Sequence, residues 1–233
     1  MKICIFGNSH AAALKHGWDL IAADHPDVTI HIYSMIGQNL SDLELEGRKL
    51  VQAGRIKTRL RRYPEEAGEE VELDLYDGFI LHGLGFLPNV RAMETPGLSS
   101  AVCEAIIADS LESTTLWKLL CDIRKVSQVP VRVGHAPLRA AEEVETRGAA
   151  DGYRMAIERA QQICFDGMQA VLIPQPEETI VNGDKTDPQF NRDVVPLTKD
   201  AAEIAGRDER HHDRVHMNPA FGALMLTRYL RSF

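Results

Sequence analysis

Two short motifs at opposite ends of the chain carry residues that could perform acyl transfer. Ser9 follows the apolar run 3–6, which predicts a strand, and precedes a segment that predicts a helix. Asp213 and His216 directly precede an Asn-Pro pair at 218–219, which is typical of a helix start. A serine hydroxyl becomes a strong nucleophile when a base takes its proton, and the base needs a third group that fixes its tautomer. The chain therefore offers a candidate nucleophile, base and orienting acid in the order Ser, Asp, His.

Each motif also has a plainer interpretation. Serine is a preferred N-cap residue, so Ser9 could simply cap the first helix. Asp213 and His216 could form an ordinary surface contact in a polar loop. His212 and His216 have the i,i+4 spacing of a zinc pair, and His211 lies beside them, so a metal site is a further alternative. The Asn-Pro pair places these residues before the helix and the chain has no HExxH pattern, so we expect no metal.

The elements that must position these residues alternate between strands and helices. Apolar runs predict five strands, at 2–7, 28–33, 77–82, 129–133 and 170–173. Helical patterns are expected at 10–23, 99–126 in two pieces, 151–167 and from 218 to the end. Such alternation predicts an α/β fold with a parallel sheet covered on both faces. We expect one domain over 1–233, with an insertion at 41–73 that contains a hairpin and solvated charges, and a long polar loop at 177–212.

The ends of the predicted strands point to one common region. In parallel sheets, sites form beyond the carboxyl ends of the strands. Ser9, Gly37, Gly83 and His135 all lie just past the ends of predicted strands. Gly85 lies in the same turn as Gly83, and glycine lets a backbone approach a ligand closely. Each of these glycines could equally be an ordinary turn residue.

Composition excludes several classes of protein. The 233 residues carry a net charge of −8, which argues against a nucleic-acid partner because phosphate binding needs a basic surface. The first residues show no targeting segment and the apolar runs are too short to span a membrane. The four cysteines are widely spaced, and we expect reduced, buried thiols in a cytoplasmic protein.

The two motifs together resemble the SGNH/GDSL hydrolase family. Residues 7–10, Gly-Asn-Ser-His, are similar to its first block, where the serine is the nucleophile and Asp is commoner than Asn at the second position. Residues 36–40 are similar to the second block, so Gly37 is expected to offer its N–H to the oxyanion hole beside that of Ser9. Residues 213–222 are similar to the last block, which supplies Asp and His. The resemblance implies a three-layer flavodoxin-like fold with a central five-stranded parallel sheet, and no cofactor.

The third block of the family departs from its pattern. The family has Gly-x-Asn-Asp, whose Asn donates to the oxyanion, whereas residues 83–86 read Gly-Leu-Gly-Phe. A missing donor typically costs ~10²–10³ in rate. We predict that Asn89, four residues beyond Gly85, turns back to supply the donor, although Asn89 could instead satisfy the turn after Pro88. The other candidates are a hole with two backbone donors, or a side chain of Asn39, His82 or His135.

The resemblance implies a serine esterase or deacylase that acts on a carboxylic ester. It would hydrolyse a small-molecule or carbohydrate ester, such as an O-acetyl group, through an acyl-enzyme intermediate. Two alternatives use the same scaffold: an acyltransferase in which an alcohol replaces water, and a non-catalytic protein that binds a carbohydrate or acyl compound. We expect the polar loop 177–212 to shape the substrate mouth. The acyl group, the alcohol and the oligomeric state are left open.

Overall fold

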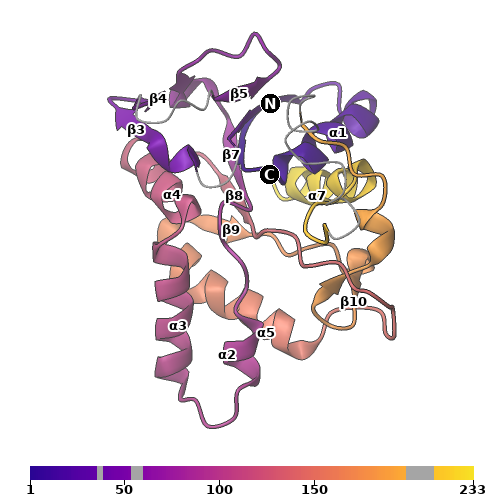
Figure 1. Cartoon of the computed structure of the whole chain (residues 1–233). Coiled ribbons are helices and arrows are strands. Elements are labelled where there is room, and N and C mark those ends of the chain that lie inside the picture. The colour runs from indigo at the N-terminus through magenta and orange to yellow at the C-terminus, as the bar shows by residue number, and fades with distance from the viewer. Residues whose placement is uncertain (36–38, 54–59, 198–212) are drawn as a thin grey trace.

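A computed structural model describes residues 1–35, 39–53, 60–197 and 213–233. At its centre lies a six-stranded sheet with helices on both faces (Figure 1). The strands, in their order across the sheet, are β5 (Arg61–Tyr63), β2 (Thr29–Ser34), β1 (Lys2–Gly7), β7 (Gly78–His82), β8 (Val131–Gly134) and β9 (Ala170–Leu172). The neighbouring strands from β2 to β9 pair in parallel, and β5 pairs with β2 in the antiparallel direction. The fold is therefore mixed α/β with a mostly parallel sheet.

The five predicted strands all belong to this sheet, but the prediction of a sheet with five strands alone is wrong. A sixth strand, β5, comes from the predicted insertion and adds to the edge at β2, where Arg61 lies opposite Ser34 and Tyr63 opposite Ile32. Its charged sequence shows no apolar alternation, which is why the pattern did not indicate a strand. Charged side chains on an edge strand also discourage pairing with another chain.

The helices agree with the predicted pattern at most positions. They are α1 (Ala11–Ile21), α2 (Val90–Glu94), α3 (Ser100–Glu112), α4 (Thr115–Val126), α5 (Asp151–Ala160) and α7 (Pro219–Arg231). The predicted division of 99–126 is confirmed, because Thr114 caps α4 by accepting a hydrogen bond from the Trp117 N–H at 3.1 Å. Helix α2 was not predicted, and α5 continues into a π-helical turn over Gln161–Phe165. Short 3₁₀ helices lie at Ala22–Asp24, Asn39–Asp42, Leu73–Leu75, Asp166–Met168, Glu177–Thr179 and Pro188–Asn191.

Side chains that alternate along the strands belong to two apolar cores, one on each face of the sheet. Ile3 and Ile5 of β1 pack with α1 and α7, whereas Cys4 and Phe6 pack on the other face with α3, α4 and α5. All four side chains are fully buried. Both faces of β1 are therefore covered, as expected for a parallel strand whose sequence is apolar from Ile3 to Phe6. Figure 1 shows the two groups of helices on opposite sides of the sheet.

Glycines allow helices α1 and α7 to pack closely against each other. A Cβ atom at Gly222 would lie 1.8 Å from the Ala13 carbonyl oxygen, and one at Gly17 would lie 2.3 Å from the Ala223 nitrogen. These contacts are with backbone atoms, which cannot swing aside as a flexible side chain can. Ser9 and His216 each lie a few residues before one of the two helices, so this close packing also sets the distance between them.

Gly222→Ala is therefore expected to lower the free energy of unfolding by about 3 kcal/mol, because overpacking forces backbone shifts. The gain in helix propensity, about 1 kcal/mol, is too small to offset this. Urea unfolding would measure the change. The matched control is Gly167→Ala, where a Cβ atom meets nothing within 4 Å and an effect within about 0.5 kcal/mol is expected. Equal effects of the two substitutions would contradict the close helix contact.

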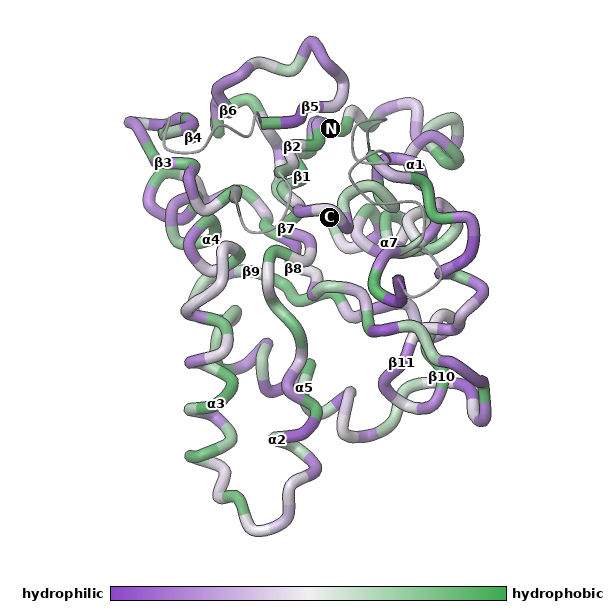
Figure 2. Tube along the Cα trace, viewed as in Figure 1, coloured by the Kyte–Doolittle hydropathy of each residue, from purple (hydrophilic) through white to green (hydrophobic). Residues whose placement is uncertain are grey.

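The insertion at 41–73 contains the expected hairpin. Strands β3 (Leu43–Glu46) and β4 (Lys49–Gln52) pair in the antiparallel direction, and β6 (Val71–Glu72) adds to β4. Leu43, Leu50 and Val71 are fully buried against the main core. The charged residues lie outside, as Figure 2 shows by the hydrophilic stretches around β3 and β4. The small sheet is therefore part of the same domain.

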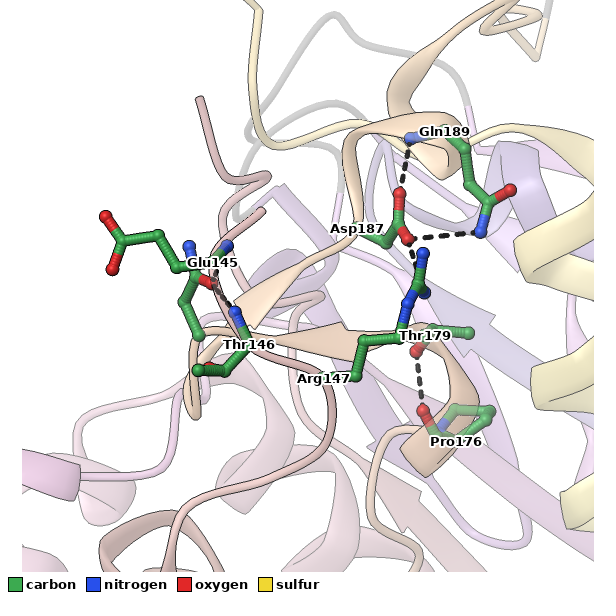
Figure 3. A network of polar contacts seen from close by, with 8 residues as sticks. Glu145, Thr146, Arg147, Pro176, Thr179, Asp187 and Gln189 are labelled. Atoms are coloured by element: carbon green, nitrogen blue, oxygen red, sulfur yellow. Dashed lines mark hydrogen bonds and ion pairs between the residues drawn. The ribbon is translucent and has the colours of Figure 1, made fainter. Parts of the chain in front are cut away.

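The described part of the predicted long loop at 177–212 contains short regular elements that the sequence did not indicate. Strands β10 (Ile180–Val181) and β11 (Lys185–Thr186) form a short hairpin between two 3₁₀ helices. Buried Asp187 accepts hydrogen bonds from Arg147 at 3.1 Å and from Gln189 at 3.0 and 3.2 Å (Figure 3). The bond from Arg147 holds the hairpin against the segment that contains this arginine. The two-residue strands are too short to give an alternating pattern. Residues 198–212 lie outside the described residues.

Two further expectations concern the whole chain. No helix within the described ranges is long and apolar enough to cross a membrane. All four cysteines carry free thiols, but only Cys4 and Cys164 are buried, whereas Cys103 and Cys121 are half-exposed. The expectation of four buried thiols is therefore wrong for two of them, because both lie on the outer parts of α3 and α4 rather than in a strand.

Candidate active site

Ser9 lies in a tight turn between β1 and α1. The Asn8 side chain accepts a hydrogen bond from the His10 N–H at 3.1 Å, and the Asn8 carbonyl accepts one from the Ala11 N–H at 3.0 Å. The Ser9 carbonyl accepts the next one, from the Ala12 N–H. Asn8 thus fixes the turn from which the half-buried Ser9 side chain projects. The cap of α1 is His10 and it makes no side-chain hydrogen bond, so the interpretation of Ser9 as the N-cap is wrong.

The segment that carries Asp213 and His216 is held at several points. One Asp213 oxygen accepts hydrogen bonds from the N–H groups of Val215 at 3.0 Å and His216 at 3.2 Å. The Asn191 side chain donates to the His216 carbonyl at 2.6 Å. Asn218 then caps α7 by accepting a hydrogen bond from the Phe221 N–H at 3.1 Å, as the sequence predicts. The segment is therefore an ordered turn in front of α7.

Ser9, His216 and Asp213 are joined by hydrogen bonds across 207 residues of sequence. His216 Nδ1 lies 2.7 Å from Asp213 Oδ2, and His216 Nε2 lies 2.9 Å from Ser9 Oγ. A carboxylate only accepts, so Nδ1 carries the proton and Nε2 is free to accept the proton of the serine hydroxyl. This is the arrangement of a nucleophile, a base and an orienting acid.

Asp213 is held as an anion. Burial raises the pKa of its carboxyl, but hydrogen bonds from the Val215 N–H and from the side chain and N–H of His216 more than offset this, and the pKa lies below its usual value. The carboxyl is therefore ionised at neutral pH, as an acceptor for Nδ1–H requires. Side-chain exposures of 32% for His216 and 37% for Asp213 leave the pair accessible from solvent.

The turn after β7 borders the turn that carries Ser9, the candidate nucleophile. Residues 83–86 form a type I′ turn, in which the Phe86 N–H donates to the Gly83 carbonyl at 3.0 Å, with φ of 51° at Leu84 and 89° at Gly85. A Cβ atom at Gly83 would lie 3.1 Å from Asn8 Oδ1, so this turn and the nucleophile turn touch. Leu84 is fully buried in a left-handed conformation that is unfavourable for its side chain, and such strain often occurs at functional sites.

The remaining oxyanion candidates differ in what the structure places near Ser9. Among the described residues none accepts a hydrogen bond from the Ser9 N–H, so this donor is available. Gly37 lies outside the described residues. Asn39 begins a 3₁₀ helix. His135 is unsuitable because both its ring nitrogens have partners, the Ala136 carbonyl at 2.6 Å and the Tyr153 hydroxyl at 2.8 Å.

Asn89 caps a short helix. Its side-chain oxygen accepts a hydrogen bond from the Ala92 N–H at 3.1 Å and starts α2. Within the described residues, no hydrogen bond joins it to the triad. The alternative weighed from the sequence was a role in the turn after Pro88, and the cap uses only the side-chain oxygen, so the donor role of the Asn89 amide group stays a prediction.

The metal alternative falls mainly on residues that the structure does not describe. His211 and His212 lie outside the described residues. Among those that are described, no three His, Cys, Asp or Glu side chains are grouped closely enough to hold a metal ion. Both ring nitrogens of His216 are hydrogen-bonded within the triad, so in this arrangement neither is open to a metal.

Sequence reasoning gave no role to His10, which lies near His82, a histidine that it did name together with His135. Burial lowers the pKa of His10 from 6.5 to about 4, that of His82 to about 3 and that of His135 to about 4. His10 and His216 also lie close to one another, with ring centroids 5.3 Å apart. His10 directly follows Ser9 in sequence, which is the one signal that could have indicated it.

These three histidines predict a strong dependence of stability on pH. Each folded-state pKa lies below 6.5, so between pH 6.5 and about 4 the unfolded chain binds more protons than the folded one. The stability present above pH 6.5 is therefore lost as the pH falls. Each group contributes up to about 1.4 kcal/mol per pH unit, or about 4 kcal/mol for the three together. Urea unfolding between pH 7 and 4.5 would measure this slope, and constant stability over that range would contradict the buried neutral state.

Comparison with known proteins does not place the chain in a family. No family model matches the sequence, and no curated protein matches it. Among solved structures, a similar chain is the water-forming NADH oxidase from Lactobacillus brevis bound to NADH, which is 11% identical with a TM-score of 0.18. The match covers 75% of this chain and 46% of the oxidase, so the chain spans less than half of that protein. So low a TM-score supports no inference about fold or activity.

Proposed function

We propose that the chain is a serine hydrolase that cleaves a carboxylic ester through an acyl-enzyme intermediate. The observation that carries the proposal is the pair of hydrogen bonds of His216, 2.9 Å to Ser9 and 2.7 Å to ionised Asp213. Three side chains from two distant segments meet in the geometry that activates a serine. The substrate class is a small-molecule or carbohydrate ester, and the chemistry needs no cofactor.

The geometry leads to a stepwise mechanism. Ser9 Oγ attacks the ester carbonyl while His216 Nε2 takes its proton, and Asp213 stabilises the resulting imidazolium. His216 then gives the proton to the leaving alcohol. Water, activated by the same histidine, attacks the acyl-serine and releases the acid. The Ser9 N–H is one donor for the oxyanion, and Gly37 is proposed as another.

The order of the strands supports a flavodoxin-like, three-layer version of the fold. Numbered among themselves, the five parallel strands run 2-1-3-4-5 across the sheet, the order of doubly wound sheets of that type. Ser9 follows the first of these strands, next to the point where the order reverses, and ligands of such sheets bind there. The free thiols of all four cysteines also suit the reducing cytoplasm that we propose for the protein.

Turnover of a short-chain aryl ester by the wild type beside Ser9→Ala would test the proposal. Hydrolysis that is lost in Ser9→Ala, together with labelling of Ser9 by a fluorophosphonate, is the expected result. Labelling with little hydrolysis until an alcohol is added would identify an acyltransferase instead. If the protein shows neither labelling nor turnover, the enzyme proposal is overturned and the binding-protein alternative remains.

The rate of hydrolysis is expected to fall as the pH drops below neutrality. His216 must be neutral to accept the serine proton, because a protonated imidazole has no ring nitrogen free to accept. Asp213 stays ionised there, because its pKa is lowered, and the buried histidines titrate nearer pH 4. Values of kcat/KM between pH 5 and 9 would check this, with circular dichroism to confirm folding. A flat profile in the folded range would contradict the role of His216 as the base.

A further inference from the structure

Two histidine ring nitrogens near the triad are buried and lack a hydrogen-bond partner among the described residues. Among the described residues, His10 Nδ1 and His82 Nε2 have none, whereas the other nitrogen of His82 lies 2.9 Å from the Tyr229 hydroxyl. His82 is 1% exposed, and His10 is partly exposed but buried at Nδ1. An unsatisfied buried polar atom destabilises a fold, and a phenylalanine would fill the same space without that penalty. Packing alone therefore does not explain these imidazoles.

The position of His10 connects it directly to the base. Its ring lies against that of His216, with centroids 5.3 Å apart and a tilt of 37°. On another side it meets Gly83, where an added Cβ atom would lie 3.2 Å from His10 Cδ2. The His10 N–H is held by Asn8 in the nucleophile turn. The ring is thus fixed between the turn after β7 and the base.

His10 faces titratable groups from two other segments. These are His216 and Asp213 from the turn before α7, and His82 from the end of β7. Burial, and to a smaller extent the charge of His216, lower the pKa of His10 to about 4, although the charge of Asp213 opposes them. His82 is also uncharged at neutral pH, since burial lowers its pKa to about 3. A positive charge on His216 therefore meets a neutral, polar ring at this face.

We propose that His10 is a positioning residue of this site, whose uncharged imidazole packs on His216 and stabilises the positive charge that His216 acquires when it takes the Ser9 proton. This role rests on the proposed hydrolase function. The His10 ring keeps water away from this face of His216, and the dipole of the same ring partly replaces the stabilisation that the water would give. A hydrocarbon ring of similar size would exclude the water and return only the attraction of its face for a cation.

His10→Phe separates this role from packing. The variant keeps an aromatic ring against His216 and removes the unsatisfied nitrogen, so its melting temperature should be equal to that of the wild type or higher. The kcat for the aryl ester should fall about tenfold with KM little changed, because the charge on His216 develops only after binding. The midpoint of the His216 ring titration, followed by NMR, should move about one pH unit lower, which is the same tenfold factor.

His31→Phe is the matched control. His31 lies on β2 opposite Cys4, in the half of the strand away from Ser9, and bonds the Tyr76 hydroxyl at 3.0 Å. It should leave kcat and the His216 titration unchanged. If kcat and the His216 titration midpoint are both unchanged in His10→Phe, the proposal is overturned. It is also overturned if kcat falls while the His216 midpoint stays the same and the melting temperature drops. If His10→Phe does not fold, His10→Leu provides the same apolar replacement and the same expected shift.

The NMR titration keeps this test independent of the proposed function. If the wild type hydrolyses no ester, the hydrolase proposal fails, whereas the movement of the His216 midpoint in His10→Phe still decides whether His10 stabilises the charged ring. A shift without turnover would support the electrostatic role of His10 alone. No shift would overturn it whether or not the protein is an enzyme.

Discussion

Ser9→Ala and His216→Ala are each expected to lower kcat for an aryl ester by about 10⁵–10⁶-fold. The hydroxyl is a weak nucleophile without the base, and the base has no proton to take without the hydroxyl. The 2.9 Å hydrogen bond between His216 Nε2 and Ser9 Oγ makes them one proton-transfer unit. The double variant should therefore be little worse than either single one. Steady-state and single-turnover kinetics would measure all three.

The matched control for this set is Ser110→Ala. Ser110 lies on α3 and its hydroxyl donates to the Ile107 carbonyl at 2.8 Å, so its removal should leave kcat unchanged. Losses that multiply in the double variant would mean that Ser9 and His216 act independently. Residual activity that resists all three changes would indicate a second nucleophile.

The sequence predicts the frame of the fold because the buried parallel strands have strong signals. The runs that form β1 and β7 are apolar at nearly every position, and both of their faces are buried. Such a run is recognisable without its neighbours. By contrast, the sequence gives little sign of β5 and β10, because their pairing depends on tertiary contacts rather than on their own residues.

The triad was predictable because each member has a local signal. Ser9 lies at a strand-to-helix turn, and the cap at Asn218 places Asp213 and His216 in a turn rather than on a helix. The local signal was ambiguous for Asn89, since an asparagine after a proline suits a cap as well as a donor. His10 could not be assigned a role from sequence, because its burial and its contact with His216 arise only when α1 and α7 meet.

Asp213→Asn is expected to lower kcat by about 10⁴-fold, less than the loss of the base itself. An asparagine keeps an oxygen that can accept the N–H groups of Val215 and His216, so the turn should persist. Its amide can instead donate to Nδ1 of His216, which then carries its proton on Nε2, where the Ser9 proton must go. The substitution therefore changes the tautomer of the base with little change in structure.

Two measurements would separate this effect from a general loss of structure. Asp187→Asn is the matched control, because Asp187 is another buried acceptor of backbone and side-chain hydrogen bonds but directly follows β11. This substitution should lower stability and leave kcat unchanged. In Asp213→Asn, NMR of the ring nitrogens should show the proton of His216 moving from Nδ1 to Nε2 while the melting temperature changes little. A variant that keeps the wild-type tautomer and near wild-type kcat would show that His216 needs no orienting acid, and the triad would reduce to a serine and a histidine.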